Sequence, residues 1–281
     1  MFKIVEKKIL NDSVTSMKIE APFVARKAEA GQFIILRVND DSERIPLTIA
    51  GYDRNEGTIR IIFQIVGSST ALLGAKEEGE YISDFVGPLG KATEVQGIKK
   101  VAVIGGGVGC AIALPVAEKL HALGAEVHSV IGFRNSNLVI LEDEFGAASD
   151  KLILMTDDGS RGRKGLVTEA LKELIDSGEE YDEVIAIGPL VMMKFVVATT
   201  RPYGIKTTVS MNPVMIDGTG MCGGCRLTVG GQVKFACVDG PDFDGHLVDF
   251  DEAIRRSKMF AKEEKQARES HRCRLEGMNH A

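Results

Sequence analysis

Three of the five cysteines of the chain fall within one short glycine-rich stretch, and this stretch constrains the fold more than any other feature. It begins at Asp217 and continues to Cys237 with the spacing Asp-x4-Cys-x2-Cys-x11-Cys. With the aspartate counted as a ligand, this is a known 2Fe-2S spacing, Cys-x4-Cys-x2-Cys…Cys, with an oxygen donor in the first place. The intervening glycines tolerate positive φ and close backbone approach to a cluster. The stretch therefore predicts an iron–sulfur loop whose metal ligands are Asp217, Cys222, Cys225 and Cys237.

A structural zinc site is the alternative interpretation of the same residues. A Cys-x2-Cys knuckle with one further cysteine and an acid also supplies four ligands of the kind that zinc binds. Unligated thiols are a third interpretation. The stretch alone leaves these alternatives open, and the rest of the chain has to distinguish them.

Composition and charge exclude several classes of function. The chain has 281 residues, of which 44% are hydrophobic and 26% charged, which is enough for two modest domains. The net charge of −6 gives no basic footprint for nucleic acid, and no apolar run has transmembrane length. No apolar region of signal-peptide type follows Met1, and an odd number of partly clustered cysteines is not a disulfide framework. We expect a cytoplasmic protein with a metal site, in which Cys110 is a small buried apolar residue.

Residues 1–97 alternate in the manner of β-strands and predict an antiparallel barrel or sandwich. The segments 33–38 and 58–66 are rich in β-branched residues and are bounded by turn residues. Two pieces of this region could carry chemistry, the segments 44–48 and 66–70. In the second, small hydroxyl residues open an apolar helix, whose free N–H groups would suit a phosphate. An ordinary Ser/Thr N-cap is the alternative there.

Residues 98–210 predict an α/β nucleotide-binding domain. An apolar strand over 100–104 runs into five residues, Gly105 to Gly109, and an apolar helix follows. This order of strand, glycine turn and helix lets a pyrophosphate approach the helix N-terminus. Glycine-containing loops also follow two later strands, at 157–160 and 188–189, which favours one shared site at the carboxyl ends of a parallel sheet. The strand that ends at Arg134 lacks a terminal acid, so the choice between NAD and NADP stays open.

Residues 211–281 predict a small cysteine-containing module over 211–250 and a helical tail over 251–281. The module contains a hairpin that turns at Gly230-Gly231, with the candidate ligands near its base. The acidic residues near its end lack the spacing of a calcium loop, and we expect a solvated acidic face from Asp242, Asp244, Asp249 and Asp251. The tail is either a surface helix or a docking arm for a partner. Its residues His271, Arg272, Cys273 and Arg274 are too few to identify a site.

The three sections together resemble the ferredoxin–NADP reductase superfamily over nearly the whole chain. The likeness is greatest to its iron–sulfur electron-transfer subunits, namely those of dihydroorotate dehydrogenase B and of NADH-dependent reduced ferredoxin:NADP oxidoreductase, also described as a sulfide dehydrogenase. It rests on an ordered set of short motifs: 45–48 (Ile-Pro-Leu-Thr), 66–70 (Val-Gly-Ser-Ser-Thr), 87–90 (Gly-Pro-Leu-Gly), 105–109, 157–160 (Asp-Asp-Gly-Ser), 188–189 (Gly-Pro) and the cysteine stretch.

The resemblance implies a flavin-binding β-barrel, a nicotinamide-binding α/β domain and a C-terminal 2Fe-2S module. It implies FAD, NAD(H) and a 2Fe-2S cluster as cofactors. The residues that it assigns to cofactor binding are Arg44, Pro46, Leu47, Thr48, Ile62, Phe63, Gln64, Val66, Gly67, Ser69, Thr70, Gly105, Gly106, Gly107, Val108, Gly109, Asp157, Gly159, Gly188 and Pro189. Asp217 stands where the dihydroorotate subunit has a cysteine, and it matches the ferredoxin:NADP branch.

The function that the resemblance implies is electron transfer within a heterodimer. NAD(H) would exchange a hydride with FAD, and the cluster would relay single electrons to a larger flavin and 4Fe-4S subunit that handles NADP and ferredoxin, by electron bifurcation. One alternative is the electron-transfer subunit for dihydroorotate oxidation. An alternative of another class is a non-catalytic nucleotide-binding protein with a zinc knuckle.

Overall fold

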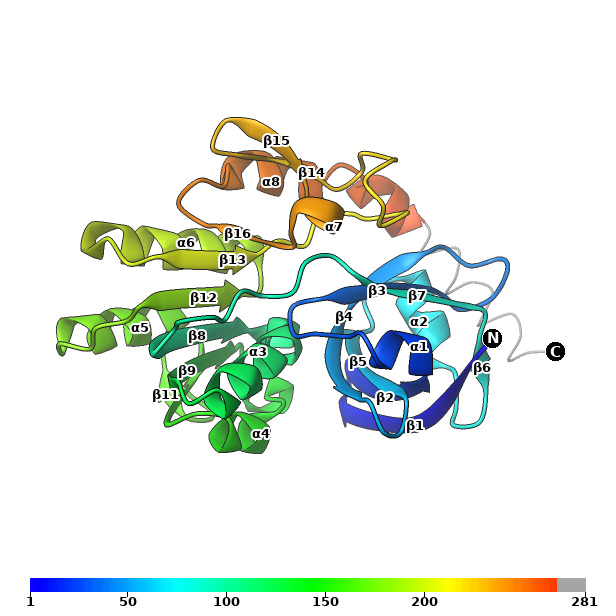
Figure 1. Cartoon of the computed structure of the whole chain (residues 1–281), viewed down its shortest axis with the longest axis horizontal. Helices are drawn as coiled ribbons and strands as arrows, with labels where there is room; N and C mark the ends of the chain where they lie inside the picture. The colour runs from blue at the N-terminus through cyan, green and yellow to red at the C-terminus, as the bar shows by residue number, and fades with distance from the viewer. Residues whose placement is uncertain (267–281) are drawn as a thin grey trace.

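The structure is a computed structural model that describes residues 1–266, and it divides into an N-terminal barrel, a parallel-sheet domain and a smaller third section. Figure 1 shows the barrel beside the sheet domain, with the third section above their junction. Among residues 1–266, none of the helices combines the length and the apolar character needed to cross a membrane.

The N-terminal section is a near-closed antiparallel barrel of seven strands in the order β6-β1-β2-β5-β4-β3-β7. Its two edge strands, β6 and β7, are neighbours in the sequence, so the sheet curls until its edges approach one another. Two short helices cover its ends. The elements are β1 (Phe2–Asn11), β2 (Val14–Glu20), α1 (Pro22–Ala25), β3 (Phe33–Arg37), β4 (Ile45–Asp53), β5 (Thr58–Gln64), α2 (Ser68–Gly74), β6 (Tyr81–Ile82) and β7 (Asp84–Leu89).

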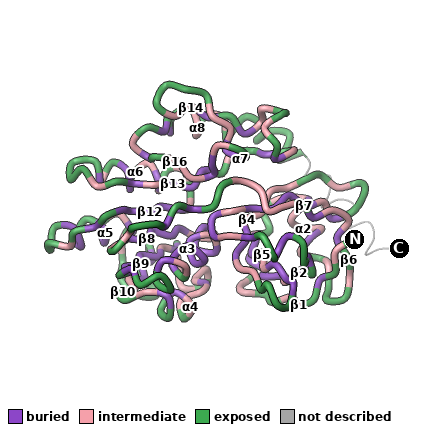
Figure 2. Tube along the Cα trace, viewed as in Figure 1, coloured by how far each residue is buried: buried purple, intermediate pink, exposed green. Residues whose placement is uncertain are grey.

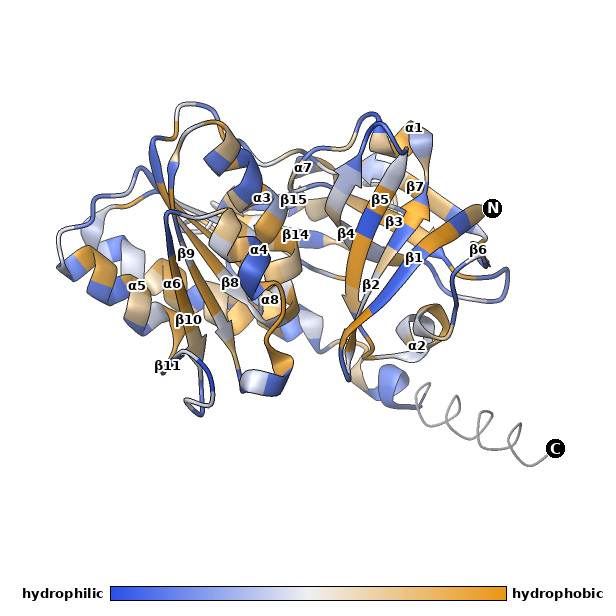
Figure 3. Ribbon diagram, turned by 90° about the horizontal axis from the view of Figure 1, so that it is seen from below, coloured by the Kyte–Doolittle hydropathy of each residue, from blue (hydrophilic) through white to orange (hydrophobic). Residues whose placement is uncertain are grey.

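The second section is a seven-stranded sheet in the order β11-β10-β9-β8-β12-β13-β16, parallel except for its last strand. Helices cover both faces, which explains why its central strands are continuous apolar runs. Figure 3 shows this apolar character along the strands. The elements are β8 (Lys100–Gly106), α3 (Cys110–Ala122), β9 (Glu126–Phe133), α4 (Glu142–Ala147), β10 (Lys151–Thr156), β11 (Arg163–Lys164), α5 (Val167–Asp176), β12 (Glu183–Ile187), α6 (Leu190–Thr200) and β13 (Thr207–Ser210).

The third section leaves the sheet after β13, forms the cysteine loop and a hairpin, and then returns to the sheet. Its elements are β14 (Arg226–Val229), β15 (Gln232–Phe235), α7 (Ala236–Asp239), β16 (Asp242–Asp244) and α8 (Phe250–Ser257). Strand β16 pairs with β13 in antiparallel fashion, so the stretch between them is held in the sheet at both ends.

One hydrophobic core joins all three sections. It contains Phe33 and Ile35 from the barrel, strand and helix residues of the sheet domain, and Cys225 and Cys237 from the third section. Figure 2 shows buried segments on both sides of the junction of the barrel and the sheet domain. The three sections therefore pack against one another through a shared core, and they are not separate domains joined by linkers.

The predicted architecture is confirmed, and one detail is wrong. The barrel, the parallel sheet, the hairpin turning at Gly230-Gly231 and the burial of Cys110 all match the expectations. The solvated acidic face is wrong for Asp242, because this carboxyl group is partly buried and accepts a hydrogen bond from Thr93. Asp244, Asp249 and Asp251 are exposed as expected. The expectations for 267–281, including Cys273, lie outside the described residues.

Candidate functional site

A cavity of about 830 Å³ lies at the junction of the barrel, the parallel sheet and the third section. Each section contributes one wall, represented by Leu47 on β4, Gly107 after β8 and Met215 before the cysteine loop. The volume lies in the range of cofactor sites, which are typically 300–1,000 Å³. The cavity opens at the carboxyl ends of the parallel strands, where ligands of open α/β sheets bind.

Two glycine loops on the sheet wall are in direct backbone contact. A Cβ added to Gly109 would lie 2.6 Å from the carbonyl oxygen of Ile187 and 2.7 Å from the Cα of Gly188. Gly107, in contrast, has a φ of +55°, and an added Cβ would meet no atom within 4 Å. The first glycine is required for packing, while the second leaves open space where the cavity meets the start of α3. Open space at the N-terminus of a helix is suited to binding an anionic diphosphate.

About half of the predicted cofactor residues line this cavity. Those that do are Pro46, Leu47, Thr48, Gln64, Gly106, Gly107, Val108, Gly109, Asp157, Gly188 and Pro189. Those that do not are Arg44, Ile62, Phe63, Val66, Gly67, Ser69, Thr70, Gly105 and Gly159. Ile62 and Phe63 are buried in the structure, and Arg44 is exposed.

The hydroxyl group of Thr70 serves its own helix. It accepts hydrogen bonds from the backbone N–H groups of Val66 and Gly67, each at 3.0 Å, as in a capping box. The N-cap residue of α2 is Gly67, so the predicted Ser/Thr N-cap is wrong, and a hydroxyl group serves the helix end from the third helical position instead. The contact does not involve Ser69, whose side chain is buried.

Sequence reasoning missed a third wall of the cavity. It consists of Ser210, Met211, Asn212, Pro213, Met215 and Pro241, which lie between β13 and β16. No local motif marks these residues. They reach the cavity because β16 returns to pair with β13, and that pairing has no signature in the sequence. Asn11, Ser13 and Phe33 of the barrel also line the cavity and were missed, because no local motif marks them.

The cysteine loop brings its four candidate ligands together in two pairs. The Asp217 carboxylate accepts hydrogen bonds from the backbone N–H groups of Thr219 and Cys222, both at 2.8 Å. These bonds, with the one from Thr219 as the largest cause, lower the pKa of Asp217. The sulfur atoms of Cys225 and Cys237 lie 3.2 Å apart. Burial, followed by the neighbouring Cys225 thiol, raises the pKa of Cys237 to about 12.

The loop is fixed from several sides. A Cβ added to Gly218, which has a φ of +74°, would lie 2.7 Å from Leu89 and 2.8 Å from Ile35, so the loop packs directly on the barrel. On the other side, the Arg256 guanidinium of α8 donates a 3.2 Å hydrogen bond to the Gly224 carbonyl oxygen. Cys222 is exposed, whereas Cys225 and Cys237 are buried.

The pairs do not converge on a single point. Within residues 1–266, one group of three potential ligand atoms lies within 4.8 Å of one another, and it consists of Glu126, His128 and Glu179 rather than the cysteines. The ligands of one tetrahedral zinc ion would all lie closer together than that, because Zn–S bonds are about 2.3 Å. A 2Fe-2S centre has two metal positions and does not require all four ligands within that distance.

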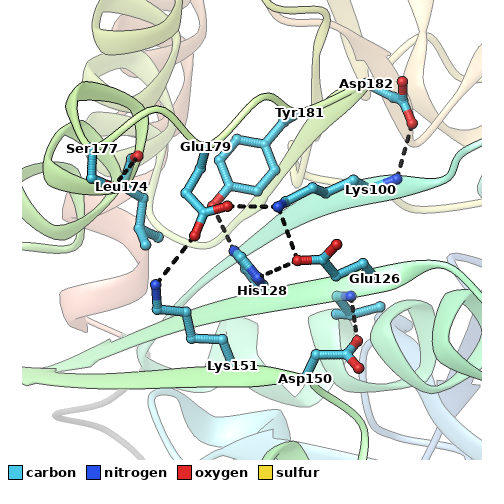
Figure 4. Close-up of polar contacts among 11 residues, drawn as sticks. Lys100, Glu126, His128, Asp150, Lys151, Leu174, Ser177, Glu179, Tyr181 and Asp182 are labelled. Carbon is cyan, nitrogen blue, oxygen red and sulfur yellow. Dashed lines mark hydrogen bonds and ion pairs between the residues drawn. The ribbon is translucent and has the colours of Figure 1, made fainter.

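The Lys100 ammonium group already serves as the cation for the group formed by Glu126, His128 and Glu179 (Figure 4). The Lys100 ammonium group lies 2.9 Å from Glu126 and 2.6 Å from Glu179. The His128 ring bonds to Tyr181 at 2.8 Å and to Glu126 at 3.0 Å. The cluster joins the amino ends of the parallel strands, on the opposite edge of the sheet from the cavity, and its geometry is that of a structural ion-pair network.

Comparisons with known proteins agree with this geometry. Residues 212–249 match the family described as the iron-sulfur cluster binding domain of dihydroorotate dehydrogenase B. A Thermotoga maritima homologue of the electron-transfer subunit of dihydroorotate dehydrogenase B (NAD(+)) is 44% identical over 263 residues, covering 94% of this chain and 93% of the relative. A protein of Clostridium beijerinckii, described as an uncharacterized protein in the adh 3' region, is 50% identical over 275 residues, covering 95% of this chain and 93% of its own.

A solved structure extends the likeness to three dimensions. It concerns flavin-based electron bifurcation and the NADH-dependent reduced ferredoxin–NADP oxidoreductase. One of its chains superposes with a TM-score of 0.92 and 40% identity, covering 96% of this chain and 97% of that chain. The barrel, the nucleotide-binding sheet and the cysteine loop thus recur together in one arrangement. The chain belongs to the family of flavin and iron–sulfur electron-transfer subunits that includes the electron-transfer subunit of dihydroorotate dehydrogenase B and has the fold of ferredoxin–NADP reductases.

Proposed function

We propose that this chain carries electrons between NAD(H) bound in the cavity and a partner subunit that docks beside the cysteine loop. The chemistry would come from FAD, which accepts a hydride from NADH and gives up single electrons, and from a 2Fe-2S cluster, which carries them one at a time. The residues of the chain bind these groups, hold them at fixed separation and keep water away from them.

The observation that carries the proposal is the continuity between the cavity wall and the cysteine loop. Met215 lines the cavity, and Asp217, two residues later, begins the loop. Gly218 then packs on Ile35 and Leu89, side chains of the barrel section that forms the opposite wall. A flavin on the barrel wall and a cluster in the loop are therefore separated by one short stretch of packed protein.

Residues of two walls fit the two organic cofactors. On the barrel wall, Pro46, Leu47 and Thr48 offer apolar surface and one hydroxyl group for the flavin ring. On the sheet wall, the open space at Gly107 fits the NAD(H) pyrophosphate at the start of α3. Gly188 and Pro189, which contact that glycine loop, are left for the nicotinamide end.

For the metal centre we propose Asp217 with Cys222 at one iron and Cys225 with Cys237 at the other. The two-pair arrangement supports iron–sulfur over a zinc knuckle. The buried Cys237 thiol, whose pKa is raised, would need a bound metal to become a thiolate at neutral pH, which is the usual coupling between ligand deprotonation and metal binding. Reduced thiols of this kind fit a cytoplasmic location.

For the partner we propose a larger subunit with its own flavin and 4Fe-4S clusters, which handles NADP and ferredoxin in an electron-bifurcating complex. The support is the similarity over nearly the full chain to the oxidoreductase structure described above. The match of the cysteine module to the dihydroorotate dehydrogenase family favours a second candidate, in which the partner oxidises dihydroorotate. Co-purification with one or the other partner separates the two.

The first experiment is an absorption spectrum of the anaerobically purified chain, with flavin, iron and zinc quantified on the same sample. We expect flavin bands, about two irons per chain as for one 2Fe-2S centre, and bleaching of the flavin on addition of NADH. A colourless protein with stoichiometric zinc and no flavin would contradict the proposal and leave a nucleotide-binding protein with a zinc knuckle.

A further inference from the structure

A partly buried acid stands behind the cavity wall at the edge of the parallel sheet. Asp242 on β16 is the cross-strand partner of Ser210 on β13, so their side chains share one face of the sheet. Ser210 is 8% exposed and lines the cavity, whereas Asp242 does not line it. The carboxyl group therefore reaches the cavity only through the serine.

The hydrogen bonds of Asp242 are arranged to fix the direction of the Ser210 hydroxyl. Thr93, in the segment that connects the barrel to the sheet, donates to Asp242 Oδ2 at 2.6 Å. Ser210, the cross-strand partner of Asp242, places a second hydroxyl group against the same carboxyl group. When this carboxyl group is ionised it can only accept, so in that state the serine proton points toward Asp242 and the lone pairs of the serine oxygen face the cavity.

The backbone holds this arrangement in place. The Met211 N–H donates to the Pro241 carbonyl oxygen at 2.9 Å, and the Lys91 N–H donates to the Gly240 carbonyl oxygen at 2.7 Å. Both bonds adjoin the pair formed by Ser210 and Asp242 on its Pro241 side, and on the other side the strand pairing continues through Val209 and Phe243. The serine is thus held on a rigid wall.

The position of Ser210 along the sheet indicates which part of a dinucleotide it would meet. The glycine turn after β8 stands near the middle of the strand order, with β9 and β10 on one side and β12 and β13 on the other. A dinucleotide with its pyrophosphate at that turn has one end toward Asp157 after β10 and the other toward Gly188 after β12. Ser210 lies one strand beyond Gly188, on the side where the barrel wall also approaches.

We propose that the Ser210 hydroxyl oxygen accepts a hydrogen bond from the carboxamide N–H of the nicotinamide, and that Asp242 is the positioning residue that keeps this oxygen an acceptor. This inference rests on the proposed binding of NAD(H) in the cavity. If Asp242 takes up a proton, it can donate to Ser210, and the serine then turns its own proton toward the cavity. Two donors would face each other, and the contact would be lost.

Binding should therefore depend on the charge of Asp242. Burial raises the pKa of this group, and the hydroxyl groups of Thr93 and Ser210 partly offset that effect. The charged group that acts on Asp242 is Glu183 on β12. Glu183, Glu94 of the connecting segment and Asp244 on β16 surround Lys206, which lies before β13. Lys206 is paired with Glu183 at 2.9 Å, so it does not neutralise Asp242. NAD+ should bind more weakly as the pH falls through the pKa of Asp242, and binding in that range should release protons.

The test is calorimetric titration of NAD+ into the full chain carrying its cofactors. Ser210→Ala and Asp242→Asn should each weaken binding about five- to tenfold, the usual contribution of one neutral hydrogen bond. The matched control is Asp244→Asn, an exposed acid on the same strand, which should bind as the wild type does. Titration in buffers of different ionisation enthalpy should show proton release by the wild type and by Asp244→Asn, but none by Asp242→Asn.

Two further ligands locate the contact. ADP-ribose lacks the nicotinamide and should bind equally to all four proteins. The 3-acetylpyridine analogue of NAD+ lacks the carboxamide N–H, so it should bind the wild type about as weakly as Ser210→Ala binds NAD+. If Asp242→Asn does not fold, the Ser210→Ala measurements with these ligands decide the question alone.

Unchanged NAD+ affinity in Ser210→Ala, or equal weakening of ADP-ribose, overturns the inference while leaving the proposed function in place. A wild-type chain that binds neither NAD+ nor ADP-ribose overturns the proposed function, and the inference fails with it. Proton release that persists in Asp242→Asn would show that another group controls binding, and the role given to Asp242 would be wrong.

Discussion

The sulfur atoms of Cys225 and Cys237 lie 3.2 Å apart in the shared core. In the part of the chain that the structure describes, both are free cysteines. Cys225 precedes β14 and Cys237 follows β15, so both lie at the open base of the hairpin, and the pairing of its strands brings them together. These two buried, neighbouring thiols are the best-defined part of the proposed metal site.

Loss of either buried thiol should remove the metal. Cys225→Ser and Cys237→Ser should each reduce iron from about two per chain toward zero, because serine is a poor ligand for a cluster that thiolates hold. Iron analysis and the visible spectrum measure the effect. Cys110→Ala is the matched control, since Cys110 is also buried but lies beside Gly105, away from the loop. Retention of full iron by Cys237→Ser would exclude it as a ligand.

Asp217 has a possible role as a turn former as well as a ligand, and two substitutions separate the roles. Asparagine can accept the same backbone hydrogen bonds from Thr219 and Cys222 but lacks the negative charge. We expect Asp217→Asn to lose much of its iron, and Asp217→Cys to keep the cluster with a shifted midpoint potential, since ligand type and charge set that potential. A redox titration of Asp217→Cys that reproduces the wild-type midpoint would count against Asp217 as a ligand.

The contact between the two glycine loops predicts a position that tolerates no side chain. Gly109→Ala would place a methyl group 2.6 Å from the Ile187 carbonyl oxygen, so one loop must move. We expect NADH-dependent flavin reduction to need at least about tenfold more NADH, because both loops line the proposed pyrophosphate and nicotinamide positions. Gly124→Ala is the control at the other end of α3. It has a φ of +85° and open space, so it should cost about 1 kcal/mol of stability without changing the NADH requirement.

The ion-pair network around His128 predicts a pH dependence of stability (Figure 4). Burial lowers the pKa of His128 below the usual histidine value of about 6.5. Below that value the unfolded chain takes up a proton that the folded chain does not, so the free energy of unfolding should fall as the pH drops from 7. The slope from this residue is at most about 1.4 kcal/mol per pH unit. Denaturant unfolding of His128→Asn at several pH values should show a smaller slope, whereas exposed His121→Asn should keep the wild-type slope.

Local sequence signals predicted the parts of the fold that local chemistry determines. The glycine run at Gly105 to Gly109 predicted a strand, turn and helix because positive φ and close packing leave few alternatives to glycine. The β-branched segment 58–66 predicted a strand, and β5 spans Thr58–Gln64. The cysteine spacing predicted a compact loop.

The rest depends on contacts between distant segments. From the sequence, Asp242 is expected to be one of several surface acids. The pairing of β16 with β13 is what brings it behind the cavity wall. In the same way Met211 and Met215 follow no motif, yet they line the cavity. Arg44, expected at a cofactor, is exposed and does not line it, because a motif match fixes a residue type and not the direction of its side chain.

The return of β16 to β13 has a consequence for the speed of electron flow. Because residues 211–241 leave and re-enter the same sheet, the cysteine loop cannot swing away from the dinucleotide-binding wall without breaking strand pairs. Gly218 also holds it against the barrel. Tunnelling rates fall steeply with distance, so a loop tied at both ends keeps that distance constant from one catalytic cycle to the next. In the proposed complex, we therefore expect any gating of electron transfer to come from the partner subunit, which would dock at the surface where Cys222 is exposed.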